Sequence, residues 1–454
     1  MRAPLAGGDP RTDPHEVDTS AALPAGPGSA FVAAVRYLRD PFAALLGAAA
    51  RHADPFTWPT FLGPVVVTGD PAGIRDILTA PPDIYTALGA ELLGPVLGTN
   101  NVILLSGDTH RAMRRFHGPL FQGDRLQGYA DAITRITSAH AARWPFDRPF
   151  DIEDSLRAIS LEVILEIVMG LDDGARREAF SQALARLIRA LRPSFMFIPA
   201  LRRSLLGLSG WDRFQRRAAQ LAALIQREME ARRATSSTGI DVLSLLMTAR
   251  QSDGTAMRAE QVMEQMVSLI GAGHDTTASA LTWALFHIHR NPAVKDRLLA
   301  ELRGVAEPAA IARLPYLDAV CAETLRLCPI APLIGRTLRS PLSVKGHLVP
   351  AGASVGISII GLHHRADLYP EPEKFVPDRF LHRQAGEAFT YLPFGGGARR
   401  CLGAAFALQE LKLVLAAVLR EHTLELVDRA PVRAALRNTT ASPAKKIRMV
   451  RRRG

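Results

Sequence analysis

The sequence predicts a mainly helical protein with small β-sheets, built as a single large domain. Apolar residues make up 48% of the 454 positions and charged residues 22%, an ordinary globular composition with ample material for a large core. Aromatic residues are only 6%, so the core must consist mainly of Leu, Ala, Val and Ile, which favours helices. No Pro/Ser-rich linker divides the chain. We therefore expect one domain over residues 31–442, a flexible lead-in at 1–30 and a basic tail at 443–454.

The individual elements follow from the spacing of apolar residues and from turn residues. The β pieces fall early and late, and helical patterns fill the middle. In chain order we expect a helix at 31–45, a strand at 61–68, a helix starting at Asp70-Pro71, mostly helical structure at 151–233, a hairpin at 343–360 with a Pro-Ala-Gly turn, and a closing helix at Leu402–Glu421.

Charge and cysteine content narrow the class of protein. The net charge is +11, and six of the basic residues lie in 443–454, so about half of the excess is local to the tail. Such a tail could contact nucleic acid or anionic lipid, but no motif supports this, and we expect a solvated tail and no nucleic-acid partner. Residues 1–30 contain no apolar span of about 20 residues, so no membrane anchor is expected. Three cysteines are too few for a disulfide framework, which indicates a reducing, cytoplasmic location.

One stretch predicts a buried helix with a polar centre. Between Glu264 and Arg290 only Asp275 carries a formal charge, and a helix that is apolar on all sides belongs in a core. Its middle, residues 271–277, contains two glycines and several polar residues that form helices poorly. We expect a local widening there, with Asp275 as a proton source and Thr276 as a hydroxyl at the opening. The alternative is a buried polar cluster satisfied within its own helix.

A second stretch predicts a metal-binding cysteine. Residues 391–403 read YLPFGGGARRCLG, and Cys401 stands directly before an apolar helix. A thiol at a helix N-terminus has its pKa lowered by the helix dipole, and Arg399 and Arg400 add positive potential. We therefore predict a thiolate at Cys401, suited to bind a metal ion. The alternative for a lone cysteine is a small buried hydrophobe.

These stretches resemble the motifs of a known family, the cytochrome P-450 superfamily. The resemblance covers about Phe31 to Met449, and the motifs occur in the family's order. They are Phe394-x-x-Gly397-x-Arg399-x-Cys401-x-Gly403 for the haem-binding loop, 272–277 for the oxygen-activating motif, Glu323-Thr324-Leu325-Arg326 for E-x-x-R, and Pro377-Asp378-Arg379-Phe380 for P-x-R-F.

The resemblance implies the cytochrome P-450 fold and a soluble, bacterial-type haem-thiolate monooxygenase carrying haem b. Cys401 would be the axial thiolate ligand of the haem iron, a metal ligand as well as a cofactor ligand. Phe394 would pack beside the sulfur, and Gly397 and Gly403 would allow the backbone to approach sulfur and porphyrin closely. Ala272 would be the residue of the long helix that lies at the haem.

The resemblance also implies which cations bind the haem propionates. Arg399 would face one propionate. His110 and Arg114 are four residues apart and so lie on one helix face, as the family's propionate pair does. Arg336, which precedes the expected hairpin, is a third cationic candidate. For each of these residues the alternative is a solvated charge.

Two further groups of residues take their roles from the resemblance. Asp275 and Thr276 would be the catalytic residues that deliver protons during oxygen activation. Glu323, Arg326 and Arg379 would form a buried ion network that holds the cysteine loop. That network is structural, because a buried charge is costly without its partner.

The resemblance also suggests a substrate pocket. Its expected walls are small and aliphatic, which favours an apolar small molecule such as a fatty acid, terpenoid, steroid or polyketide. Plain core packing is the alternative for each residue. The candidates are Ile270, Ile330, Ala331, Leu333, Ile334, with Ala272 and the Gly-rich loop at 92–102.

Electrons would come from a separate protein, unless peroxide is the oxidant, because the chain shows no flavin or nicotinamide fingerprint and is too short for a fused reductase. Arg111, Arg115, Arg400 and Lys412 would offer a basic face to an acidic ferredoxin or flavodoxin. Dioxygen would be the co-substrate. The alternative from another class is a haem-binding sensor that inserts no oxygen, but such a protein does not need the Asp275-Thr276 pair.

Overall fold

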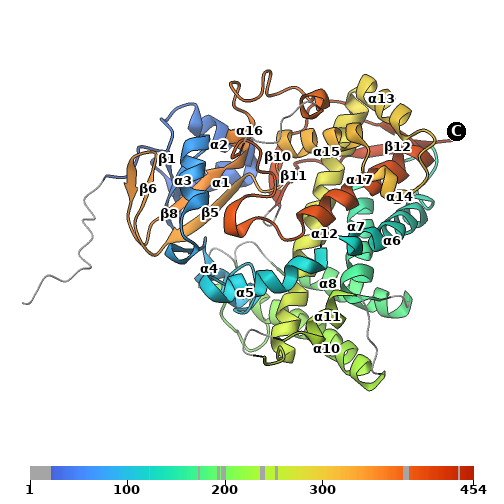
Figure 1. Ribbon diagram of the computed structural model, residues 1–454, viewed down its shortest axis with the longest axis horizontal. Coiled ribbons are helices and arrows are strands. Elements are labelled where there is room, and N and C mark those ends of the chain that lie inside the picture. The colour runs from blue at the N-terminus through green and yellow to red at the C-terminus, as the bar shows by residue number, and fades with distance from the viewer. Residues whose placement is uncertain are drawn as a thin grey trace, which may run out of the picture.

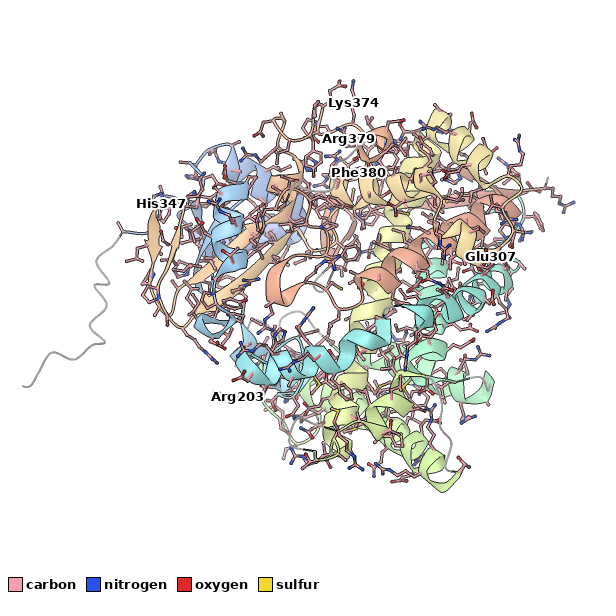
Figure 2. All side chains as sticks on the ribbon, in the orientation of Figure 1. Arg203, Glu307, His347, Lys374, Arg379 and Phe380 are labelled. Carbon is pink, nitrogen blue, oxygen red and sulfur yellow. The ribbon has the colours of Figure 1, made fainter. Side chains whose placement is uncertain are left out.

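Figure 1 shows the computed structural model, which describes residues 22–121, 123–171, 174–191, 195, 201–235, 241–250, 254–381, 388–437 and 440–453. A large helical body occupies one side, and a mixed sheet with the first three helices occupies the other (Figure 1). Figure 2 adds the described side chains to both parts. The predicted architecture, mainly helical with small sheets in a single domain, is confirmed.

Most of the chain is helical. The helices are α1 (Ala30–Arg39), α2 (Pro41–Ala49), α3 (Pro71–Thr79), α4 (Ala90–Leu97), α5 (Gly107–His117), α6 (Asp124–Ala141), α7 (Ile152–Met169), α8 (Gly174–Ala190), α10 (Gly210–Thr235), α11 (Val242–Thr248), α12 (Ala259–Arg290), α13 (Pro292–Leu302), α14 (Pro308–Ile311), α15 (Pro315–Leu327), α16 (Ile359–His363) and α17 (Ala404–Glu421). Short 3₁₀ turns include Pro377–Phe380 and Gly397–Arg399. Within the described residues, no helix is both long and apolar enough to cross a bilayer.

The largest sheet has the order β1-β2-β8-β5-β3. Its strands are β1 (Phe56–Thr60), β2 (Gly63–Thr68), β8 (Ser354–Ser358), β5 (Leu333–Leu338) and β3 (Tyr85–Ala87), and only the pair β2 and β8 is parallel. Three smaller ladders are β6 (Leu342–Val344) with β7 (His347–Val349), β10 (Ala434–Arg437) with β11 (Thr440–Pro443), and β12 (Arg448–Arg452) between β4 (Pro149–Asp151) and β9 (Thr423–Leu426).

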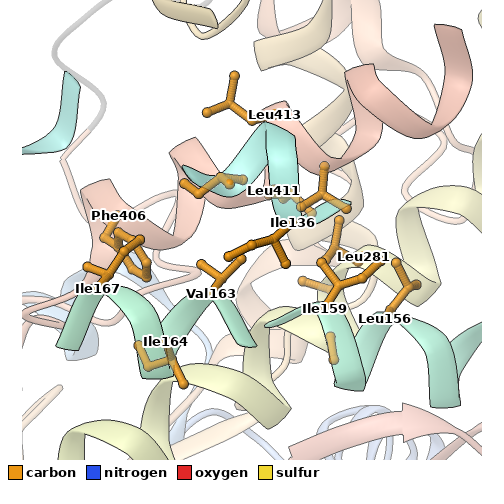
Figure 3. Packing of buried hydrophobic residues seen from close by; sticks show 14 of the residues in the cluster. Ile136, Leu156, Ile159, Val163, Ile164, Ile167, Leu281, Phe406, Leu411 and Leu413 are labelled. Atoms are coloured by element: carbon orange, nitrogen blue, oxygen red, sulfur yellow. The ribbon is translucent and has the colours of Figure 1, made fainter. Parts of the chain in front are cut away.

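The long helix α12 forms the axis of the main core. Its C-terminal half is buried on every side, as the run of apolar residues predicted. Helices α7 and α17 pack against it, α6 packs against both of these helices, and their aliphatic side chains interdigitate (Figure 3). Leu281 of α12 contributes to this core together with Val163 of α7 and Leu411 of α17, each at most 1% exposed.

Two local predictions are wrong in detail. The Pro-Ala-Gly turn at 350–352 does not join paired strands: β6 pairs with β7 across Lys345-Gly346, and β8 instead lies between β2 and β5. Helix α12 is continuous from Ala259 to Arg290, so the expected widening at 271–277 is not present. Hydroxyl groups that bond back to carbonyls one turn earlier absorb the polar centre without interrupting the helix.

The chain ends also differ from expectation. The predicted solvated tail at 443–454 contains strand β12, whose Met449 and Val450 are buried between two neighbouring strands. Met449 and Val450 are adjacent and flanked by arginines, so their side chains point to opposite faces of the strand and both are buried, which explains why this basic segment still forms a strand. Part of the predicted lead-in is docked, because Thr57 Oγ1 donates to the carbonyl of Pro24 at 2.6 Å. Residues 1–21 lie outside the described residues.

Candidate active site

The cysteine loop and the long helix are tied together by one short segment, residues 100–106. At its start, Ser268 of α12 donates to Asn101 Oδ1 at 2.8 Å, and Asn101 is fully buried. Towards its end, Arg399 of the cysteine loop donates to the carbonyl of Ile103 at 2.9 Å and to Ser106 Oγ at 3.1 Å. This segment, which overlaps only the end of the glycine-rich loop predicted at 92–102, therefore bridges the two motifs, while the first part of that loop belongs to helix α4.

Cys401 lies in a hollow within the protein. It is exposed, whereas Cys321 and Cys328 are buried, yet protein atoms surround it closely enough for burial to raise the pKa of its thiol. The N–H of Gly403, Arg114 and Arg400 each oppose this shift but do not outweigh it. The pKa of Cys401 is thus raised and not lowered as predicted, because desolvation outweighs the local positive charges. A bound metal ion would deprotonate the thiol regardless.

The loop geometry around Cys401 is set by its neighbours. The Cys401 N–H donates to the carbonyl of Phe394 at 2.9 Å, which closes the loop. Gly397 has a φ of 62°, and a Cβ there would lie 2.6 Å from the carbonyl oxygen of Leu78 in α3. Glycine is therefore required at Gly397 for packing against α3. At Gly403 no heavy atom lies within 4 Å of a built Cβ, so that side of the backbone is open.

The four predicted propionate ligands interact electrostatically with one another: Arg336 and His110 are buried, and Arg114 and Arg399 are partly buried. The pKa of Arg399 falls to about 10, mainly through burial, with Arg336 and Arg114 adding to the shift. The pKa of His110 falls to about 4, through burial and then through Arg399 and Arg114, so its imidazole is neutral near pH 7. Among the described residues, none of the three arginines forms an ion pair with a carboxylate.

The positive charge of these arginines shows whether the site fits the negatively charged propionates of a haem. Buried cations that repel one another and lack carboxylate partners are unfavourable without an anion. Arg336 is only 5% exposed and donates just to carbonyls, those of Ile77 and Gly396. Two propionates would supply the missing negative charge, and the exposed thiol of Cys401, which interacts electrostatically with Arg114, would supply a soft metal ligand. The residues present therefore fit a haem.

The middle of α12 presents a small exposed strip. Gly271 and Ala272 are exposed although most of the following half of the helix is buried. Thr276 donates its hydroxyl hydrogen to the carbonyl of Ala272 at 2.7 Å, and Thr277 donates to the carbonyl of Gly273 at 2.9 Å. The helix therefore satisfies the hydroxyl groups of its polar centre, as one of the two interpretations of the sequence predicted, whereas Asp275 is paired outside the helix.

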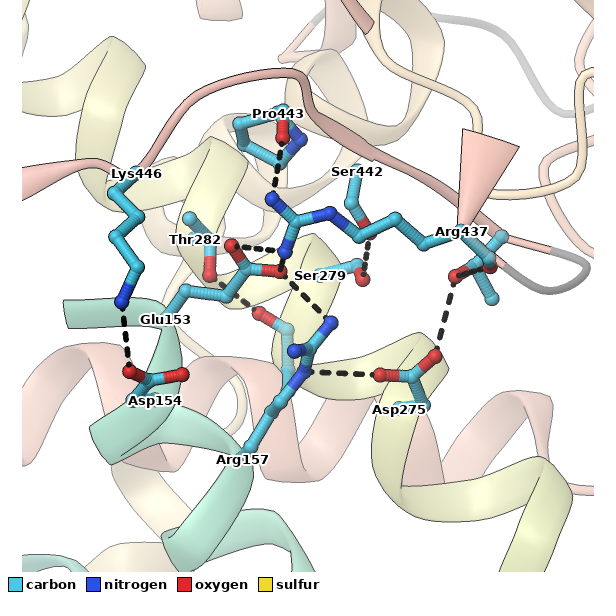
Figure 4. A network of polar contacts seen from close by, with 12 residues as sticks. Glu153, Asp154, Arg157, Asp275, Ser279, Thr282, Arg437, Ser442, Pro443 and Lys446 are labelled. Atoms are coloured by element: carbon cyan, nitrogen blue, oxygen red, sulfur yellow. Dashed lines mark hydrogen bonds and ion pairs between the residues drawn. The ribbon is translucent and has the colours of Figure 1, made fainter. Parts of the chain in front are cut away.

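Asp275 is held by residues outside the predicted set. Its Oδ1 lies 3.0 Å from Nε of Arg157 in α7, and Thr440 Oγ1 donates to its Oδ2 at 3.3 Å (Figure 4). Arg157 and Arg437 both also pair with the buried Glu153 at 2.9 Å. A cavity of about 590 Å³ reaches Asp275 from this side. Neither Arg157 nor Arg437 lies in a motif, so the sequence carries no signal for these two partners.

The predicted ion network is formed. Arg326 pairs with Glu323 through two bonds of 2.6 and 3.0 Å, and Arg379 Nε lies 3.1 Å from the same carboxylate. Arg326 also donates to the carbonyl of His363, whose Nε2 accepts from the N–H of Leu392 at the start of the cysteine loop. The network therefore reaches the loop through His363. Figure 2 labels Arg379 at the upper edge of the molecule.

The predicted pocket residues separate into two groups. Ile270 is 1% exposed and packs in the main core, which makes it a core residue and not a pocket wall. It is buried because it lies about 200° around the helix from the exposed Ala272. The others remain partly accessible: Ile330 and Ala331 precede β5, and Leu333 and Ile334 begin it. A Cβ added at Gly395 would lie 3.3 Å from Cδ1 of Ile334, so the cysteine loop runs close to this group.

Comparison with known proteins identifies the class to which this site belongs. The family model for cytochrome P450 matches residues 49–450. The chain is 35% identical to a protein named cytochrome P450 135B1 from Mycobacterium bovis, over 94% of this chain and 90% of that one. It is 32% identical to cytochrome P450 137 from Mycobacterium tuberculosis, over 94% and 89%. The solved structure of retinoic-acid-bound cyanobacterial CYP120A1 matches with a TM-score of 0.82 at 24% identity, covering 95% of this chain and 99% of that chain.

The chain belongs to the cytochrome P450 family. It is an oxidoreductase of the monooxygenase type, and its cofactor is haem b with an axial cysteine thiolate. The names of the two mycobacterial relatives specify no substrate.

Proposed function

We propose that this protein inserts one atom of dioxygen into an apolar small molecule, using electrons from a separate redox protein. The observation that carries the proposal is the setting of Cys401. It is the one exposed cysteine of three, and it interacts electrostatically with Arg114, which belongs to a group of arginines that pair with no carboxylate in the described residues. When bound, the haem supplies dioxygen binding and activation. The protein contributes binding, orientation and control of protons.

The cofactor site would be held by residues from three elements. Cys401 would ligate the iron, with Phe394 and Gly403 shaping the loop beside the sulfur. Arg114 and Arg399 would pair with the propionates, and Arg336 would add a third cation from β5. His110, neutral near pH 7, would contribute an N–H donor instead of a charge.

Proton handling would involve Asp275 and Thr276. The hydroxyl of Thr276 donates its hydrogen to the carbonyl of Ala272. Its oxygen therefore keeps a lone pair that can accept a hydrogen bond from a group bound at the exposed strip. Asp275 is paired with Arg157, and its carboxylate must leave that arginine before it can pass a proton to the strip. Movement of the Asp275 carboxylate between Arg157 and the exposed strip would carry protons from the surface cavity to the interior.

The substrate would be apolar. Ile330, Ala331, Leu333 and Ile334 offer aliphatic surface and no charge, which supports a fatty acid, terpenoid, steroid or polyketide without distinguishing among them. The neighbouring structure with bound retinoic acid is compatible with an apolar ligand, although that ligand is a property of the other protein.

An acidic redox partner, a ferredoxin or flavodoxin, would dock on exposed arginines. Of the four expected basic residues, Arg111 is paired with Asp83 and Asp108, and Lys412 is paired with Asp318. Arg115 and Arg400 are exposed and have no ion pair within the described residues. We therefore assign the partner's electrostatic attraction to these two. A cytoplasmic location belongs to the same proposal.

The test is spectroscopic and then chemical. The purified protein should show the carbon monoxide difference spectrum of a reduced thiolate-ligated haem, and Cys401→Ala should lose it while Cys328→Ala retains it. Apolar compounds that shift the haem spin state should give products heavier by one oxygen when electrons are supplied through a surrogate ferredoxin system. A spin shift with no oxygenated product from any binder would favour the haem-binding sensor instead.

A further inference from the structure

Helix α1 carries an unusual concentration of exposed apolar side chains. Of the fourteen large apolar residues that are exposed in the described chain, four lie on this ten-residue helix: Phe31 at 68%, Leu38 at 46%, Val32 at 45% and Val35 at 39%. Scattered single residues of this kind need no explanation, but a contiguous patch marks a surface that contacts something apolar.

The geometry of α1 arranges three of these residues in one stripe. At 100° per residue, Phe31, Val35 and Leu38 lie within about 60° of one another. The opposite side of the helix is used for folding: Ala33 is buried, and the Tyr37 ring lies 6.2 Å from that of Trp58 in β1. The apolar stripe is therefore not needed for the contact between α1 and the sheet.

Beside the stripe lies a basic groove of about 790 Å³. Its floor is apolar, formed by residues that include Ala44 and Trp58. Its basic residues are His52 and the exposed arginines Arg36, Arg39, Arg51 and Arg433. Within the described residues none of these four arginines forms an ion pair, and the one acidic residue of the groove, Asp40, accepts a hydrogen bond from the N–H of Ala43 as the N-cap of α2.

We propose that α1 and this groove form a peripheral docking surface for an anionic lipid bilayer. The stripe of Phe31, Val35 and Leu38 enters the interface between headgroups and acyl chains, and Arg36 and Arg39 meet the phosphates beside it. Figure 1 places α1 with α2 on the sheet side of the molecule, away from the helical body. The inference is independent of the haem chemistry, because none of these residues belongs to the proposed active site.

Charge and area argue for a bilayer over a protein partner. At a lipid surface, the arginines can pair with anionic headgroups while the apolar stripe contacts the acyl chains. Each arginine near an anionic surface adds about fivefold in affinity. A single ten-residue helix is too small for a stable protein interface, which needs about 800 Å² from each side. A bilayer has no such minimum, since weak contacts suffice for reversible binding.

The experiment is co-sedimentation of the purified full-length holoprotein with vesicles. We expect binding to vesicles of phosphatidylcholine with 30% phosphatidylglycerol, much weaker binding to phosphatidylcholine alone, and loss of binding at high salt. Val35→Asp and Leu38→Asp should each weaken binding at least tenfold, and Arg36→Gln and Arg39→Gln about fivefold each. Val427→Asp, at a position of similar exposure beyond β9, is the matched control and should bind as the wild type does.

Three results would overturn the proposal. One is no binding to anionic vesicles, and another is equal weakening by Val427→Asp and Val35→Asp. The third is binding of monomeric dodecyl phosphate in the groove with no vesicle binding, which would make the ligand a free amphiphile. Because these variants lie on an exposed helix face, an unchanged haem spectrum and unfolding midpoint verify that each one is folded.

Discussion

Arg157 of α7 lies 3.0 Å from Asp275 at the centre of α12, and this ion pair fixes the position of the carboxylate. Arg157 also pairs with Glu153, which is buried and shared with Arg437 (Figure 4). The position of Asp275 is therefore set by residues far from it in sequence. A carboxylate in this arrangement can carry protons only by exchanging partners.

Asp275→Asn tests that exchange. An amide keeps a hydrogen-bond acceptor for Thr440 but cannot take up and release a proton. We expect haem content and substrate binding to stay unchanged, and turnover to fall about 100-fold, the size of a typical general acid–base contribution. The measurement is the rate of product formation in H₂O and D₂O. Glu153→Gln serves as the control for the loss of a carboxylate beside Arg157. Wild-type turnover in Asp275→Asn would remove Asp275 from proton delivery.

Thr276→Ala tests the role of the hydroxyl on the exposed strip. Without it, protons are delivered with less control, so we expect reducing equivalents to be lost as hydrogen peroxide while the haem stays bound. The fraction of electrons that appears in product should fall about tenfold or more. Thr277→Ala is a close control, because Thr277 makes the same bond to a carbonyl one turn earlier but is buried. Equal coupling in Thr276→Ala and the wild type would contradict the assignment.

Sequence predicted the motifs well because each of them is local. The long run of apolar residues predicts the buried part of α12. Asp70 followed by Pro71 predicts the start of α3. E-x-x-R places two charges one turn apart on one helix, so the pairing of Glu323 with Arg326 is contained in the spacing.

Other features depend on contacts that spacing does not contain. The parallel pairing of β2 with β8 joins residues almost 290 positions apart, and nothing in either strand specifies the other. The same holds for Arg157 beside Asp275. The pKa of Cys401 was predicted in the wrong direction because the local charges are visible in sequence, whereas the desolvation that outweighs them comes from the packed structure.

Glu323→Gln tests the ion network under the cysteine loop. Glu323 and Arg326 have fully buried side chains, and removing one charge leaves the other without compensation. We expect the free energy of unfolding to fall by about 3–5 kcal/mol and haem to be retained poorly, as measured by urea titration and by the ratio of haem to protein absorbance. The pair of Arg297 with Asp378 is about half exposed, so Asp378→Asn should cost less than about 1 kcal/mol. Similar losses in both variants would show that burial does not decide the effect.

Glu410 of α17 gives a substitution that should stabilise the protein. Its side chain is fully buried, and neither carboxyl oxygen has a well-formed hydrogen bond within the described residues. Burial raises its pKa from 4.5 to about 8, with a small opposing effect from Ser160. Because the folded state holds this proton more tightly than the unfolded state, stability due to Glu410 decreases as pH rises from about 4.5 to about 8.

Glu410→Gln removes this titration. At pH 4.5 the variant and the wild type should have similar free energies of unfolding, and at pH 7 the variant should be more stable by about 3 kcal/mol, from linkage over the two pKa values. Urea titrations at both pH values measure the difference. Glu421→Gln, on the exposed last turn of the same helix, should show no comparable gain. If Glu410→Gln is destabilising at pH 7, the Glu410 carboxylate is ionised and paired with a positive group in the folded protein. The buried carboxylate would then stabilise the fold and not destabilise it.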